Sequence, residues 1–169
     1  MTPHLARSLQ AEVRVALDSH VEPPDVVPGI LNDLWVIERS LRWHLQQKAR
    51  DHFGASWRSD AFHEETRERV VERAWRDAVI TTRNIEEIGN PFDWLTLDEL
   101  ISLLEEPWAA VPTCPAVLWR RFLSDVLPVR NRLAHFRLPA LDDAATVLRW
   151  RRDLVTRLGR AVVPESSLS

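Results

Sequence analysis

Apolar residues recur at intervals of three and four along most of this 169-residue chain, the spacing of one face of an α-helix. Prolines stand between these segments, and no segment alternates apolar and polar residues as a half-buried strand would. The pattern predicts an all-α fold, an up-and-down helical bundle with extra short helices. The expected helices span about 2–20, 30–52, 60–82, 96–106, 115–135 and 142–160.

The prolines also divide the chain into three parts. Residues 1–29 form an N-terminal helical arm followed by a Pro-rich connector, Val21–Gly29, which we expect to be extended. Residues 30–162 form the helical domain, and residues 163–169 a flexible tail. A chain of this length can bury a sizeable core.

Composition excludes several classes of function. The four glycines are scattered, so no phosphate-binding Gly-rich loop is present. His63-Glu64-Glu65-Thr66-Arg67 has an arginine where a zinc-binding helix needs its second histidine, and we expect neither a metal nor a cofactor. One cysteine cannot form an internal disulfide. Without a long apolar run or a signal-peptide pattern, we expect no membrane association and a cytoplasmic location.

Charge is unevenly distributed. Residues 116–169 contain 10 arginines and 5 acidic residues, whereas residues 1–115 contain 12 basic and 20 acidic residues. A basic third within a chain of net charge −3 indicates either a surface for a polyanion or a segment that neutralises the rest of the fold. Both interpretations stay open at this point.

The basic third contains the most informative motif, Arg130-Asn131-Arg132-Leu133-Ala134-His135. Arginine is a permanent cation that suits phosphate, and histidine exchanges a proton near neutral pH. Together they meet the needs of RNA cleavage through the 2′-hydroxyl. Five residues of a straight helix separate Arg130 and His135 by roughly 140°, so a site needs a second surface or a kink. Pro128 is expected to supply a kink.

The motif and its flanks resemble the HEPN superfamily, and most closely the Swt1-type HEPN domain, over about residues 30–160. That family carries an Arg-polar-x-x-x-His motif at the end of a long helix, before a short loop and a final helix. The other segments that carry the resemblance are Leu34–Arg42, Gly54-Ala55-Ser56-Trp57 and Asn90–Leu100.

The resemblance implies a metal-independent endoribonuclease that acts as a homodimer, with two motif helices lining one cleft. It implies that Arg130 holds the scissile phosphate and that His135 acts as general base or acid. It also implies that Asn131 orients the histidine or the phosphate by hydrogen bonds. Glu38 is the implied polar support from an early helix. The implied setting is a toxin or phage-defence effector that cuts RNA, for example tRNA, with an antitoxin or a sensor protein as a further partner.

Other roles are open for the residues around the motif. Arg132 and Arg137 are candidates for RNA-backbone contacts, although each could be a solvated arginine. His135 could instead be a structural residue at a helix end. Trp57 and Trp108 lie near loops and could stack on bases. The alternative function is a non-catalytic HEPN module for dimerisation or for binding RNA, a nucleotide or a protein partner.

Overall fold

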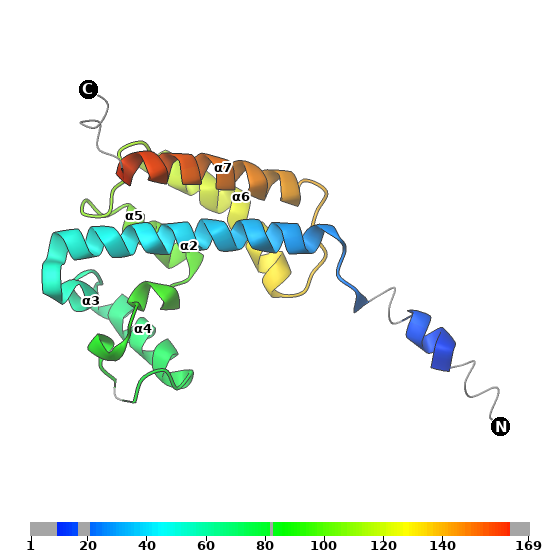
Figure 1. Ribbon diagram of the computed structural model, residues 1–169, viewed down its shortest axis with the longest axis horizontal. Coiled ribbons are helices and arrows are strands. Elements are labelled where there is room, and N and C mark those ends of the chain that lie inside the picture. Colours follow the sequence, from blue (N-terminus) through cyan, green and yellow to red (C-terminus); the bar gives the residue numbers. More distant parts are fainter. Residues whose placement is uncertain (1–9, 17–20, 82, 163–169) are drawn as a thin grey trace.

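Three long helices form the body of the molecule. The computed structural model describes residues 10–16, 21–81 and 83–162, and this part of the chain contains helices and turns but no strand. Helices α2 (Val26–Phe53) and α7 (Asp143–Val162) lie side by side, and α6 (Ala116–Ala134) packs against both (Figure 1). The prediction of an all-α fold is confirmed.

Helix α2 begins earlier than the sequence suggested. The Val27 N–H donates to the Pro24 carbonyl over 2.9 Å, and Pro28 lies in the first turn, where a backbone N–H has no intrahelical acceptor. The expectation that Val21–Gly29 is extended throughout is therefore wrong for its second half. Of the N-terminal arm, residues 10–16 are helical, and the rest of the predicted helix lies outside the described residues, as does the predicted tail.

One face of α2 is buried in the core. The helix turns Ile30, Ile37, Leu41 and Leu45 into the core. Leu31 and Trp35 adjoin this stripe and are 48% and 69% exposed. Adjacent positions on a helix differ by about 100°, so apolar side chains next to the buried stripe can face solvent.

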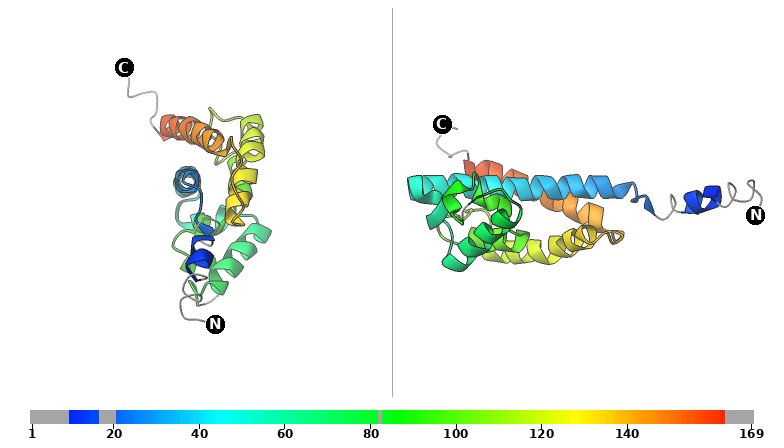
Figure 2. Two further views of the ribbon diagram at one scale, coloured as in Figure 1. Left: turned by 90° about the vertical axis from the view of Figure 1, so that its right-hand side faces the viewer. Right: turned by 90° about the horizontal axis from the view of Figure 1, so that it is seen from below.

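Aromatic packing joins α6 to α7. Phe122 is fully buried and meets Trp119 and Trp150 edge-on, with ring centroids 6.3 and 5.4 Å away. The Trp150 indole N–H donates to Asp125 on α6 over 2.9 Å. Seen end-on, α2 lies between the layer of α7 and the short helices, with α6 along one side (Figure 2). This packing fixes the helix that carries the motif.

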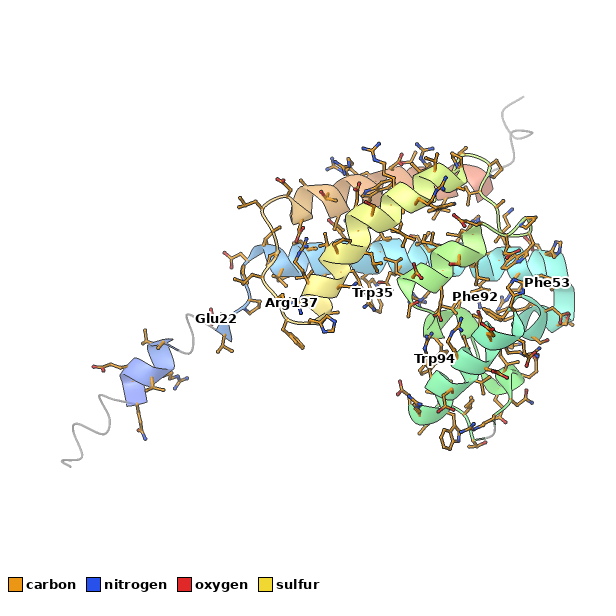
Figure 3. All side chains as sticks on the ribbon, turned by 180° about the vertical axis from the view of Figure 1, so that it is seen from behind. Glu22, Trp35, Phe53, Phe92, Trp94 and Arg137 are labelled. Atoms are coloured by element: carbon orange, nitrogen blue, oxygen red, sulfur yellow. The ribbon has the colours of Figure 1, made fainter. Side chains whose placement is uncertain are left out.

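Two prolines shape α6, one at its start and one in its interior. Pro115 is the N-cap residue, and Pro128 lies inside the helix, where its missing N–H removes one hydrogen bond. Figure 3 shows α6 changing direction toward its C-terminal end, near the labelled Arg137. The motif therefore lies on the short segment that follows the proline.

Short elements close one end of the bundle. The sequence predicted one helix over about 60–82, and that prediction is wrong: α4 ends at Arg76, and Ala78 adopts a left-handed φ of +55°. Trp57 is buried and stacks on Phe92, so it is a core residue and not a base-stacking one. The elements in this region are η1 (Gly54–Ser56), α3 (Trp57–Asp60), α4 (Glu64–Arg76), η2 (Ile85–Glu87), η3 (Pro91–Trp94) and α5 (Leu97–Leu104).

The N-terminus of α5 is a capping box, in which the Glu99 N–H donates to Thr96 and the Thr96 N–H donates to the Glu99 carboxylate. Arg69 and Arg73 of α4 also donate to Glu99, over 3.0 and 2.6 Å. Burial by itself raises the pKa of Glu99, but the hydrogen bonds from Arg73, the Thr96 N–H and Arg69 outweigh burial and lower it to about 2.

A depressed carboxyl pKa predicts how stability depends on pH. Because Glu99 titrates lower in the folded chain than in the unfolded one, its contribution is present above about pH 5 and is lost as pH falls toward about 2. We expect Glu99→Gln to lower the free energy of unfolding by about 2 kcal/mol at pH 7 and by much less near pH 3. Urea titrations across this range measure the difference. Glu105→Gln, which changes an exposed residue close in the sequence, is the control. If the free energies of unfolding of wild type and Glu99→Gln differed by the same amount at all pH values, the lowered pKa of Glu99 would be contradicted.

Candidate functional site

A groove of about 550 Å³ lies between α2, η3 and the C-terminal half of α6. We call it the motif groove, because Arg130 lines it together with Leu133 and Ala134 of the same helix. The opposite wall comes from α2, and its apolar part includes the exposed Trp35. The polar residues that line the groove are Glu38, Arg39, Arg42, Asp93 and Arg130.

The polar wall of the motif groove is held by Arg42. This guanidinium donates to Glu38 over 2.8 Å and to the carbonyl oxygens of Phe92 and Leu95 over 3.2 and 3.0 Å. Each of its three nitrogens therefore has an acceptor, and η3 is tied to α2. Nearby, Arg39 donates to Asp93 over 2.7 Å. These bonds keep Glu38 in one position, facing Arg130.

Among the described residues, Arg130 forms an ion pair with Glu38. Its Nε lies 3.8 Å from Glu38 Oε1, which is a longer contact than the 2.8 Å bond between Arg42 and the other Glu38 oxygen. Within the described part of the chain the Arg130 guanidinium makes no hydrogen bond, and its side chain is 40% exposed. Arg130 is thus oriented by a carboxylate but has free donors toward the groove, an arrangement that suits a phosphate.

His135 and Asn131 lie outside the motif groove. His135 is the C-cap residue of α6, and its backbone N–H donates to the Asn131 and Arg132 carbonyl oxygens over 3.2 Å each. Both side chains are exposed. Arg130 therefore lines the motif groove and His135 does not.

The two flanking arginines differ from each other. Arg132 donates through Nε and Nη2 to Asp143, a carboxylate that is only 5% exposed and that also accepts the Ala140 N–H over 2.8 Å. This geometry gives Arg132 a structural role, joining the end of α6 to the start of α7, and its candidate RNA contact stays a prediction. Arg137 is exposed just beyond the helix (Figure 3).

Three residues that line the motif groove were not predicted from the sequence. Arg39, Arg42 and Trp35 line the motif groove, but none of them was singled out as a candidate. A signal was available, because Arg39 and Arg42 follow Trp35 and Glu38 by four residues and so share helix faces with them. The partners from η3, including Asp93, come from a distant segment and have no local signal.

The described residues contain no group of three or more histidine, cysteine or acidic residues arranged to hold a metal ion. Among them, no helix is both long and apolar enough to cross a membrane. His44 is buried beside the Ala109 carbonyl, and burial lowers its pKa, but it lies outside the motif groove.

The chain was compared with known proteins. No protein-family model, curated protein or solved structure matches it. The HEPN resemblance thus rests on the residues quoted above.

Proposed function

We propose that this protein is a metal-independent endoribonuclease of the HEPN type that acts as a homodimer. The observation that carries the proposal is the position of Arg130, which faces the motif groove with free donors and is oriented by Glu38. His135 is exposed at the end of the same helix and is accessible to a substrate. These are the two groups that phosphodiester cleavage through a 2′-hydroxyl requires.

In the proposed reaction a histidine removes the proton from the 2′-hydroxyl, and the 2′-oxygen attacks the adjacent phosphorus. Arg130 stabilises the negative charge that grows on the phosphoryl oxygens. The bond to the 5′-oxygen then breaks, and that oxygen takes up a proton from water while the histidine returns its proton to the solvent. The products are a 2′,3′-cyclic phosphate and a 5′-hydroxyl, with no metal or cofactor consumed.

A second copy of the chain can bring a histidine to the arginine of the motif groove. Since Arg130 and His135 diverge on α6, a twofold axis near this end of the helix brings the arginine of one protomer toward the histidine of the other. Leu31 and Trp35 offer exposed apolar surface beside the motif groove that such a partner would cover. This supports a homodimer as the active form.

A second candidate function is a binding module without catalysis. The contact between Arg130 and Glu38 supports it, because a carboxylate in the groove competes with a phosphate for the same guanidinium. In either case RNA is the proposed ligand, and tRNA is one candidate. A toxin or phage-defence role, restrained by an antitoxin or a sensor protein, belongs to the same proposal.

Incubation of the purified protein with total RNA and with tRNA in EDTA tests the proposal. We expect cleavage products that end in a cyclic 2′,3′-phosphate, detectable by their resistance to a phosphatase that removes only open 3′-phosphates. Binding of RNA without any cleavage would favour the module. Cleavage that EDTA abolishes would contradict the metal-independent mechanism.

A further inference from the structure

The C-terminus of α6 ends in a tight hydrogen-bonded turn with an unusual residue at its centre. The Phe136 N–H donates to the Leu133 carbonyl over 3.0 Å, and the Arg137 N–H donates to the Arg132 carbonyl over 2.8 Å. This pair of bonds defines a Schellman motif, whose central position, here Phe136, is usually a glycine.

The aromatic side chain is costly at this position. Phe136 has a φ of +54°, in the left-handed region that disfavours residues with a Cβ. Burial does not offset that strain within the chain, because Phe136 is 99% exposed. Strained non-glycine residues concentrate at functional sites, where the conformation aims a side chain at a ligand.

The surroundings of the ring indicate what it meets. His135 and Arg137 flank it and are exposed, and Asn131 is exposed one turn earlier on α6. A flat apolar surface beside donors and a cation suits a nucleic acid base whose phosphate lies close by. The tryptophans that sequence reasoning offered for this role do not fit it, since Trp57 is buried and Trp108 packs on Phe53 at 5.3 Å.

We propose that Phe136 stacks on an unpaired base next to the scissile phosphate, so that the substrate is single-stranded RNA. The inference rests on the proposed function, because it places that base beside His135. Bases in a duplex are stacked on one another and present no free face to a protein ring. The hydrogen-bonded turn fixes the backbone of Phe136 beside His135, which lowers the entropy cost of stacking.

A second copy of the chain is the competing occupant, because Leu138 and Leu141 are also exposed in this loop. The charges favour RNA. Arg137 is exposed directly after Phe136, and a cation beside the ring attracts a phosphate.

The test uses a 12-nucleotide RNA with 2′-O-methyl groups, which the proposed reaction cannot cleave, as a single strand and as a duplex. Fluorescence anisotropy measures the Kd of each for the full-length protein. Loss of one base–aromatic stack weakens binding by about fivefold to 100-fold. We expect that loss for the single strand in Phe136→Leu and Phe136→Gly, with little change for the duplex, and near wild-type binding in Phe136→Trp.

Thermal unfolding separates this role from a structural one. Phe136→Gly relieves the left-handed strain, so we expect its Tm to rise by about 2–4 °C while its affinity for the single strand falls. A structural role for the ring predicts that Tm and affinity fall together, which would overturn the proposal. Val117→Ala, which trims an exposed apolar residue at the other end of α6, is the matched control.

Three further outcomes separate the role of Phe136 from the proposed nuclease function. Single-strand affinity of Phe136→Leu within twofold of wild type overturns the inference, even if the wild type cuts RNA. Dissociation of a dimer by Phe136→Leu in sedimentation assigns the ring to the second copy and also overturns it. A wild type that binds the single strand through Phe136 but cuts no RNA leaves the inference standing and refutes the proposed nuclease.

Discussion

Replacing His135 by alanine is expected to lower the rate of RNA cleavage by about 10²–10⁴-fold, the usual contribution of a general acid or base. The side chain is exposed and only the backbone of His135 takes part in the turn, so the fold should be unaffected. Arg130→Ala should give a comparable loss, because it removes the cation that faces the growing phosphate charge. Initial rates on labelled RNA measure both effects.

Mixing the two inactive variants tests whether the site spans two chains. If a site combines Arg130 of one protomer with His135 of the other, each mixed dimer contains one intact site. Equal mixing should then restore about a quarter of wild-type activity, because half of the dimers are mixed and half of their sites are intact. Arg120→Ala, an exposed arginine on the same helix, is the control and should keep full activity. No recovery on mixing would contradict the composite site.

The second large effect concerns stability. Asp143 is buried, accepts two hydrogen bonds from Arg132 and one from the Ala140 N–H, and so joins α6, the loop and α7. We expect Asp143→Ala to lower the free energy of unfolding by about 2–4 kcal/mol, because it leaves a half-buried guanidinium and an amide unpaired. Urea denaturation measures the change.

The neighbouring residue provides the control for that experiment. Asp142 is exposed, and the Thr146 N–H donates to its backbone carbonyl, so this bond does not use the side chain. Asp142→Ala should therefore cost less than about 0.5 kcal/mol, as is usual for surface positions. Equal midpoints for Asp143→Ala and wild type would show that the ion pair contributes nothing to stability. Since the same pair anchors the turn before His135, Asp143→Ala should also reduce cleavage.

The parts of the fold that follow local rules could be predicted from sequence. The helix starts expected near 96 and 115 depend on a few adjacent residues, the capping box at Thr96 and Glu99 and the proline at 115, and both starts are confirmed. The end of α4 was not predictable in the same way. Its left-handed Ala78 has no glycine or proline to mark it, so helical periodicity alone continues through that point.

In the candidate site, too, local features could be predicted from the sequence and tertiary contacts could not. The divergence of Arg130 and His135 follows from helix geometry and needed no coordinates. The pairing of Arg132 with Asp143 and the bonds of Arg42 to η3 join segments 11 to 53 residues apart in the chain. Such contacts depend on tertiary packing. The sequence alone does not distinguish an arginine that pairs with a buried carboxylate from an arginine that is exposed to solvent.

The proline inside α6 has a mechanical consequence. The missing amide at Pro128 interrupts the ladder of backbone bonds between the anchored half of the helix, which holds Phe122, and the final turn, which holds Arg130. The final turn is nevertheless held against α7, because Arg132 donates to the buried Asp143 and Leu133 is part of the core. The proline therefore sets the direction of the last turn, and these contacts keep Arg130 at a fixed angle to the rest of the helix.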